Sequence, residues 1–248
     1  IPPLDLKQVE VIKGPAATLF GGDAIAGVVN FVTKDPEEKP VTTLIFNQTS
    51  ALGTDFSVFN SRKYSRFGYT LLGSANYQKA YDVDDDDFTE LPRTHSLGFT
   101  PKLLFYIDKT TTLTVGNSTS YQDRKGGDTF VLKGRSDGFH QYFEQNKSFR
   151  NITTFNLNKE FKDGGHLFVK QSFAFFKRDL TTQNYEFNGS QFNSYTDVSY
   201  ARAFGKHAVV FGGSGVYDQF REGTPGIDIP RNETRSSIGL FIQDTVDL

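Results

Sequence analysis

The sequence predicts an all-β protein in which about ten antiparallel strands form part of a transmembrane β-barrel. Three observations predict this class. Long runs of residues alternate between apolar and polar side chains, short and long connections follow one another along the chain, and 25 Phe with 11 Tyr supply the aromatics that line the borders of a membrane barrel. A soluble β-sandwich is the other architecture that alternation and aromatic residues allow.

Each strand is predicted from its two-residue period, which places alternate side chains on opposite faces of a sheet. Leu71 and Tyr77, for example, share one face, whereas Thr70 and Asn76 share the other. Many of the runs exceed the usual length of soluble strands and suit a tilted membrane-crossing strand. The predicted strands cover residues 41–50, 54–63, 67–79, 94–106, 111–122, 148–160, 166–178, 190–203, 206–218 and 235–247.

The connections between these strands alternate in length after the first hairpin. The short ones are residues 64–66, 107–110, 161–165 and 204–206, and the long ones are residues 80–93, 123–147, 179–189 and 219–234. A membrane barrel has short periplasmic turns and long extracellular loops, so this order favours a barrel over a Greek-key sandwich. All the long loops would then lie on the outer side of the membrane.

Composition excludes several other classes of protein. No apolar run approaches the roughly 20 residues of a transmembrane helix, and the mean hydropathy is −0.44. Cysteine is absent, which removes disulfides and thiol chemistry, and a net charge of −2 gives no electrostatic reason to bind nucleic acid. We find no nucleotide loop and no hydrolase motif, so no enzyme is expected. Methionine and a signal peptide are also absent, and we expect the chain to be a segment of a longer protein.

The segment from Val9 to Lys34 has a different pattern. An apolar run stops at Gly14-Pro15, where proline can open a helical turn, and Gly21-Gly22 suits the end of that turn. The β-formers of residues 28–33 then predict a second strand. The spaced elements are Val9-Glu10-Val11, Lys13-Gly14-Pro15, Phe20-Gly21, Ala24-Ile25, Gly27, Val28-Val29-Asn30 and Thr33-Lys34.

These elements resemble the end of the plug domain of TonB-dependent outer-membrane receptors, in the style of the Bacteroides group. The resemblance divides the chain into a plug end at residues 1–34, a linker at 35–40 and a barrel part at 41–248, which belongs to a barrel of 22 strands. Gly27 is expected at a close approach of two backbones. The structural motif residues are Lys13, Gly14, Pro15, Gly21, Gly27 and Asn30.

The resemblance also implies a function, which is active uptake of a scarce nutrient across the bacterial outer membrane. It implies an iron chelate such as a ferric siderophore as cargo, with cobalamin, haem and glycan as other choices. The implied partners are TonB with its inner-membrane complex, the outer-membrane lipid, the nutrient and a surface lipoprotein. A soluble ligand-binding module and a passive porin are the alternatives, although a porin has no plug.

Two loops carry candidate binding residues. The predicted loop at 123–147 combines basic and aromatic side chains, which suit an anionic aromatic ligand, although an ordinary exposed loop explains them equally well. These candidates are Arg124, Lys125, Arg135, His140, Tyr142 and Phe143. The acidic run Asp84, Asp85, Asp86 and Asp87 offers oxygen ligands for calcium, but it lacks the spacing of a calcium loop, and a solvated loop tip is the favoured interpretation.

Overall fold

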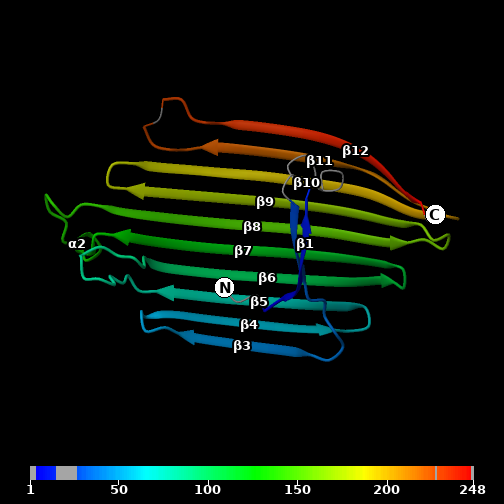
Figure 1. The fold of residues 1–248 in the computed structure, drawn as a ribbon, viewed down its shortest axis with the longest axis horizontal. Helices are drawn as coiled ribbons and strands as arrows, with labels where there is room; N and C mark the ends of the chain where they lie inside the picture. Colours follow the sequence, from blue (N-terminus) through cyan, green and yellow to red (C-terminus); the bar gives the residue numbers. More distant parts are fainter. Residues whose placement is uncertain (1–3, 15–26, 227, 247–248) are drawn as a thin grey trace.

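The computed structural model describes residues 4–14, 27–226 and 228–246. Ten strands form one antiparallel sheet in chain order, from β3 at one edge to β12 at the other (Figure 1). These strands are β3 (Val41–Gln48), β4 (Gly53–Lys63), β5 (Phe67–Gln78), β6 (Arg93–Asp108), β7 (Thr111–Gly127), β8 (Phe143–Glu160), β9 (His166–Thr182), β10 (Glu186–Phe204), β11 (His207–Glu222) and β12 (Glu233–Val246). The predicted antiparallel all-β class is confirmed.

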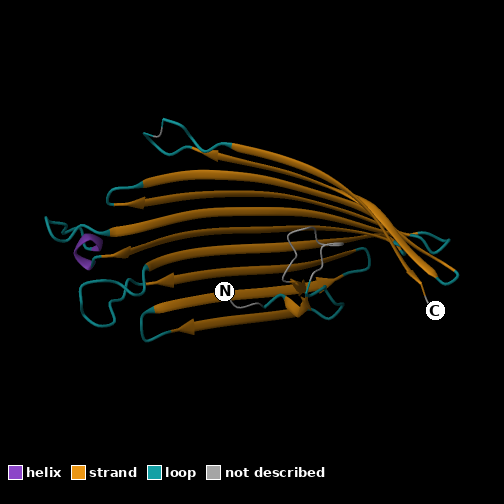
Figure 2. Cartoon of the chain, turned by 45° about the horizontal axis from the view of Figure 1, so that its top comes forward, coloured by secondary structure: helices purple, strands orange, loops and turns teal. Residues whose placement is uncertain are grey.

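A separate pair of strands lies against one face of this curved sheet (Figures 1 and 2). In this pair, β1 (Leu6–Lys13) runs antiparallel to β2 (Gly27–Thr33). Lys102 of β6 joins the pair to the sheet, because its amino group donates to the Thr33 hydroxyl at 3.0 Å and to the Lys34 carbonyl at 2.6 Å. We call the face that bears Lys102 the lumenal face and the opposite face the outer face.

Alternation along each strand gives the two faces different chemistry. On β6 the lumenal side chains include Thr100 and Lys102, whereas Leu97 and Phe99 point to the outer face, where they are 60% and 52% exposed. Leu240 of β12 is 86% exposed. Exposed apolar side chains on one face and polar side chains on the other are the pattern of a barrel wall that meets lipid outside and water inside.

The residues predicted as a linker pack against the sheet. Pro36 is buried above Gly68, where a side chain would meet the proline ring, and the Lys63 N–H donates to the Glu37 carbonyl at 2.8 Å. Phe59, only 1% exposed, lies beneath them with the Lys34 amino group over its ring. This region is the most buried apolar part of the structure described, and it holds the hairpin of β1 and β2 over the lumenal face.

The strands extend further at the outer end than the sequence predicted. Residues 123–127 and 143–147 continue β7 and β8 as paired strands, so the loop between them spans only 128–142. The predicted long loop at 179–189 is wrong, because β9 and β10 pair up to Thr181 and Glu186 and leave a short turn. Their outer ends are polar, and backbone pairing continues there without the apolar alternation that the prediction required.

The hairpin shows why two of its glycines are needed. Gly14 has φ +93° and Gly27 has φ +129°, both in the region that favours glycine, and a Cβ on Gly27 would collide with the Ile12 carbonyl oxygen. Asn30 donates to the Glu10 carboxylate at 2.8 Å across the pair. Pro15, Gly21 and the predicted helical turn lie outside the described residues. In the part of the chain that is described, no helix has the length and apolar character to cross a membrane.

Candidate ligand-binding site

The lumenal face carries a polar hollow near the outer ends of β4 to β9. Its volume is about 470 Å³, and the side chains that line it on this face are Asp55, Asn76, Ser96, Ser120, Gln122, Ser148, Arg150 and Phe176. Each comes from a lumenal position of its strand, so six neighbouring strands contribute to one wall. Hydroxyl and amide groups dominate the hollow, and one guanidinium supplies positive charge.

Local contacts orient these groups. The guanidinium of Arg150 lies 5.1 Å from the centre of the Phe176 ring, and the Gln122 amide donates to the Ser96 hydroxyl at 3.2 Å. Asn76 donates to the Asp55 carboxylate at 2.6 Å. An exposed arginine over an aromatic ring, surrounded by hydroxyls, can bind a flat anionic ligand through charge, stacking and hydrogen bonds.

The outer loop at 128–142 is organised around Asp128, whose side chain is only 5% exposed. Asp128 precedes the short helix α2 (Thr129–Leu132) and accepts a hydrogen bond from the Phe130 N–H at 2.8 Å. Its other carboxylate oxygen is 2.7 Å from Nδ1 of His140, and the His140 ring stacks on Phe130 with 4.2 Å between centres. The 128–142 loop is therefore closed on itself around one buried carboxylate.

The electrostatics of this pair follow from its burial and contacts. Burial alone would raise the pKa of Asp128, but hydrogen bonds from His140 and from the Phe130 N–H outweigh it and lower that pKa. The Asp128 carboxylate, as hydrogen-bond acceptor, raises the pKa of His140. The pair is thus strongest as a carboxylate beside a protonated imidazole.

The loop at 79–92 docks onto the same unit. The Thr89 hydroxyl accepts from the Gly127 N–H at 2.9 Å, and the Thr129 N–H donates to the Asp87 carbonyl at 2.8 Å. The rings of Phe88 and Tyr142 stack with 5.8 Å between centres. The two loops therefore form one ordered body at the outer end of β5 to β8.

The structure separates the loop residues that the sequence grouped as ligand-binding. Arg124 points to the lumenal face, but Lys125 lies on the outer face with its amino group 4.7 Å from the Phe143 ring centre. His140 and Tyr142 contribute to the packing of the loops. Arg135 is exposed near the end of α2. Of this group, only Arg124 lies on the same face as the polar hollow.

The acidic run adopts a different grouping from the predicted one. Carboxylate oxygens of Asp82, Asp84, Asp86 and Glu90 lie within 4.8 Å of one another, whereas Asp85 and Asp87 are outside this group. Repulsion by Asp86, with smaller effects of burial and Glu90, raises the pKa of Asp84. The backbone is left-handed at Asp85 and Asp87, and the carboxylates of Asp82, Asp84 and Asp86 are the ones that come together. The sequence alone did not indicate this grouping.

Sequence reasoning missed Arg150 and Phe176 as members of the lumenal hollow. The region 148–160 alternates weakly, because lumenal Ile152 and outer-face Asn151 and Thr153 break the pattern. The register provides the missing signal, since it aligns Arg150 with Phe176 and with Ser120 of the neighbouring strands.

Comparison with known proteins agrees with this fold. The TonB-dependent Receptor Plug Domain family matches residues 1–28. A vitamin B12 transporter of Vibrio vulnificus is 31% identical over 83 residues, which are 33% of this chain and 14% of that protein. A ferric enterobactin receptor of Pseudomonas aeruginosa is 44% identical over 39 residues, which are 16% of this chain and 5% of that protein.

Solved structures extend the comparison to the whole sheet. The alcaligin outer membrane receptor of Bordetella pertussis superposes on this chain with a TM-score of 0.79 at 13% identity. The superposed region covers 99% of this chain and 40% of that receptor. The siderophore receptor PirA of Pseudomonas aeruginosa gives a TM-score of 0.71 at 16% identity, with 100% and 42% covered. This chain thus spans less than half of the solved receptors that it matches. The plug match, the relatives and the shared fold make the chain similar to part of the TonB-dependent receptors of the bacterial outer membrane.

Proposed function

We propose that this protein is a receptor for active nutrient uptake and that its cargo is a ferric siderophore. The nutrient binds on the lumenal side of the wall and against the outer loops. TonB and the inner-membrane complex then supply energy that displaces the plug. The contact of Lys102 with Thr33 and Lys34 supports this proposal, because it holds the hairpin of β1 and β2 where a displaced plug would open a path.

The cargo is proposed from the chemistry of the lumenal hollow. Arg150 over Phe176, surrounded by serine hydroxyls and amides, suits an anionic iron chelate with planar groups. Similar proteins bear names that refer to ferric enterobactin, iron regulation and vitamin B12. Cobalamin is therefore the second cargo to test. A soluble module or a porin would leave the plug-like hairpin without a role.

Uptake of iron-55 by living cells tests the proposed transport. A strain that lacks the gene is compared with the same strain carrying it, with iron-55 supplied as the organism's own siderophore complexes. We expect uptake only with the gene, and we expect a protonophore to abolish it. Equal uptake by the two strains would refute the iron proposal. Uptake of labelled cobalamin, measured in parallel in the same two strains, tests the second cargo. Uptake that resists the protonophore would indicate passive permeation.

Substitution of Arg150 tests the role of the hollow. In the full receptor, Arg150→Gln removes the positive charge and the cation–π contact, and we expect affinity for a ferric siderophore to fall about tenfold. Lys206→Gln, in the turn between β10 and β11, is the matched control and should bind as the wild type does. Unchanged binding by the Arg150 variant would remove this hollow from the ligand site.

We also propose that the carboxylates of Asp82, Asp84, Asp86 and Glu90 hold calcium. Four oxygen donors that repel one another favour a hard divalent cation, and one Asp82 oxygen is buried without a hydrogen-bond partner among the described residues. Calcium should raise the thermal midpoint of the receptor, and Asp84→Asn with Asp86→Asn should remove that shift. An identical shift in this double variant, or none in the wild type, would contradict the proposal.

A further inference from the structure

Four short turns at one end of the wall share one feature. Each joins two neighbouring strands at the same end of the sheet (Figure 1), and each carries one exposed basic side chain. These turns connect β4 to β5, β6 to β7, β8 to β9 and β10 to β11. The short turns of an outer-membrane barrel face the periplasm. Their basic side chains, which we call the periplasmic basic row, are Arg66, Lys109, Lys162 and Lys206.

The charges of the periplasmic basic row are available to a partner. Nearby carboxylates are paired with strand residues instead, since Asp108 lies 3.3 Å from the Lys159 amino group. In the same way, Asp163 lies 2.8 Å from the Arg202 guanidinium. Within residues 4–14, 27–226 and 228–246, none of the ion pairs and cation–π contacts includes a member of the row. The row therefore offers its positive charges to a partner outside the chain.

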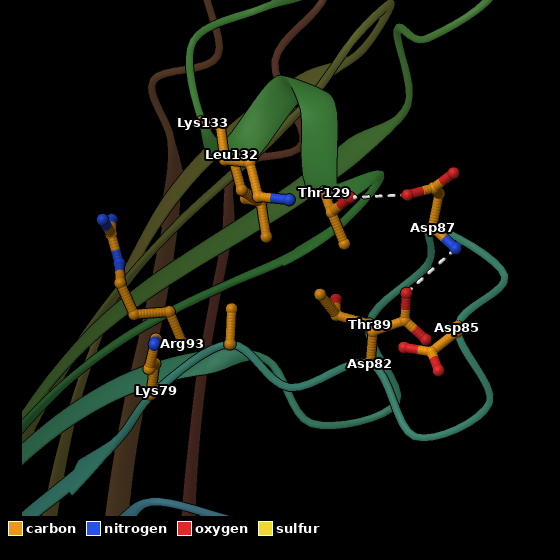
Figure 3. A pocket seen from close by; sticks show the side chains of 10 residues that line it. Lys79, Asp82, Asp85, Asp87, Thr89, Arg93, Thr129, Leu132 and Lys133 are labelled. Atoms are coloured by element: carbon orange, nitrogen blue, oxygen red, sulfur yellow. Dashed lines mark hydrogen bonds between the residues drawn. The ribbon is translucent and has the colours of Figure 1, made fainter.

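The opposite end of the wall carries charges of both signs. There, Lys79 and Arg93 lie on one side of a pocket of about 440 Å³, and Asp85 and Asp87 lie on the other side (Figure 3). Opposite charges that face each other in this way attract and reduce the need for external counter-ions. The two ends of the wall therefore differ, because the outer end sets positive against negative charge across one pocket, whereas the periplasmic basic row depends on its surroundings.

Aromatic side chains adjoin the row on the outer face. Phe161 directly precedes one member of the row and Phe204 lies two residues before another, and both rings are exposed. The ring centre of Tyr200 lies 6.2 Å from that of Phe161 and 5.5 Å from that of Phe211, so the rings follow one another across β8 to β11. Aromatic girdles mark the border of the hydrocarbon layer, and long basic side chains beyond them reach the headgroups. The row therefore lies at the height of the headgroups of the periplasmic leaflet.

The spacing of the turns suits separate headgroups. Successive turns are two strands apart, which places them about 10 Å or more from one another. This leaves room for one phosphate group beside each basic side chain, with the acyl chains against the aromatic rings. A free phosphate would gain nothing from those rings, and a zwitterionic lipid would bring a positive charge of its own toward the row.

We propose that the periplasmic basic row binds the phosphate headgroups of anionic phospholipids in the periplasmic leaflet of the outer membrane. The acyl chains of these lipids pack against Phe161, Tyr200 and Phe204. The row lies at the opposite end of the wall from the lumenal hollow, so this site does not depend on the nutrient that the receptor carries. Its effect is to gather anionic lipid around the periplasmic rim.

Native mass spectrometry of the full receptor in detergent tests the proposal, with phosphatidylglycerol as the probe. A variant that replaces every member of the row with glutamine should retain at least about threefold less phosphatidylglycerol than the wild type, because each basic residue near a membrane surface attracts anionic lipid. A second variant keeps the charges and should retain the lipid as the wild type does. Its changes are Arg66→Lys, Lys109→Arg, Lys162→Arg and Lys206→Arg.

The matched control removes the same number of charges at the outer end of the wall. It should retain phosphatidylglycerol as the wild type does, and it carries Lys79→Gln, Lys133→Gln, Arg135→Gln and Lys147→Gln. Phosphatidylethanolamine should bind the wild type weakly, an excess of inorganic phosphate should not displace phosphatidylglycerol, and each variant should keep the heat-modifiable gel migration of a folded barrel. Equal retention by the glutamine variant of the row and the outer-end control, or full displacement by inorganic phosphate, would overturn the proposal.

Discussion

Asp128 organises the outer loop at 128–142. It caps α2, contacts His140 and is almost fully buried. One carboxylate thus satisfies both ends of the 128–142 loop, and Thr129, the next residue, carries the contact to Asp87.

Replacement of Asp128 should loosen both loops together. In Asp128→Ala the cap and the His140 contact are lost, and the loss of a cap alone costs about 0.5–2 kcal/mol. Hydrogen exchange should become faster at residues 79–92 and 128–142 and stay unchanged in the strands below. Asp228→Ala, an exposed carboxylate in another loop, is the control. Faster exchange in only one of the two loops would show that they are independent.

The same pair predicts a dependence of loop order on pH. The pKa of His140 is raised, so its contribution is complete below the unfolded value of about 6.5 and is lost as pH rises through the folded pKa. The pKa of Asp128 is lowered, so its contribution is present above its ordinary value of 3.8 and is lost as pH falls through the folded pKa. Protection from exchange at 128–142, relative to the intrinsic rate at each pH, should be greatest in mildly acidic solution. Protection that stays constant across neutral pH would contradict this prediction.

Among the secondary-structure elements, the hairpin of β1 and β2 depends on glycine. Gly27→Ala would place a methyl group against the Ile12 carbonyl and strain a left-handed backbone, at a cost of about 1–3 kcal/mol. We expect faster proteolysis of residues 4–34 in the folded receptor. Gly138→Ala, which meets open space and has no positive φ, is the control. Equal resistance of the two variants would show that the hairpin tolerates a side chain there.

The strands show how far the sequence alone predicts this fold. Where one face meets lipid, as at Leu97 and Phe99, alternation is sharp, and the predicted strands end within a few residues of the observed ones. The outer ends of the strands extend past the lipid, and both of their faces are polar. The alternation of apolar and polar residues therefore does not indicate that β9 continues to Thr182. The sequence motif predicted the plug-like segment. Its packing through Pro36 and Lys102 could not be predicted, because those contacts join residues far apart in sequence.

The candidate site was less predictable than the fold for the same physical reason. The sequence grouped basic and aromatic residues by their nearness in one loop, but the sheet assigns Arg124 and Lys125 to opposite faces. Arg150 and Phe176 come from different strands and meet only through register. A binding wall made of one residue from each strand has no local signature in the sequence.

For the molecule as a whole, the central feature is a hairpin fixed to the inner side of a lipid-facing wall. Lys102 contacts the Thr33 hydroxyl, the Lys34 carbonyl and the Asp35 carboxylate, and Pro36 is buried where the chain passes onto the wall. Under the proposed uptake function this arrangement has to change during transport, because the hairpin lies across the lumenal face of the wall. A receptor with an immobile hairpin should therefore bind its cargo without importing it.

A reversible cross-link between the hairpin and the wall tests this most directly. The chain has no native cysteine, so Thr33→Cys with Lys102→Cys can be joined in the full receptor by a short, reducible bis-methanethiosulfonate reagent. Each single variant treated with the reagent is the control. We predict that the joined receptor binds a ferric siderophore normally, that its iron-55 uptake stops, and that reduction restores uptake. Undiminished uptake with the cross-link in place would contradict displacement of this hairpin during transport.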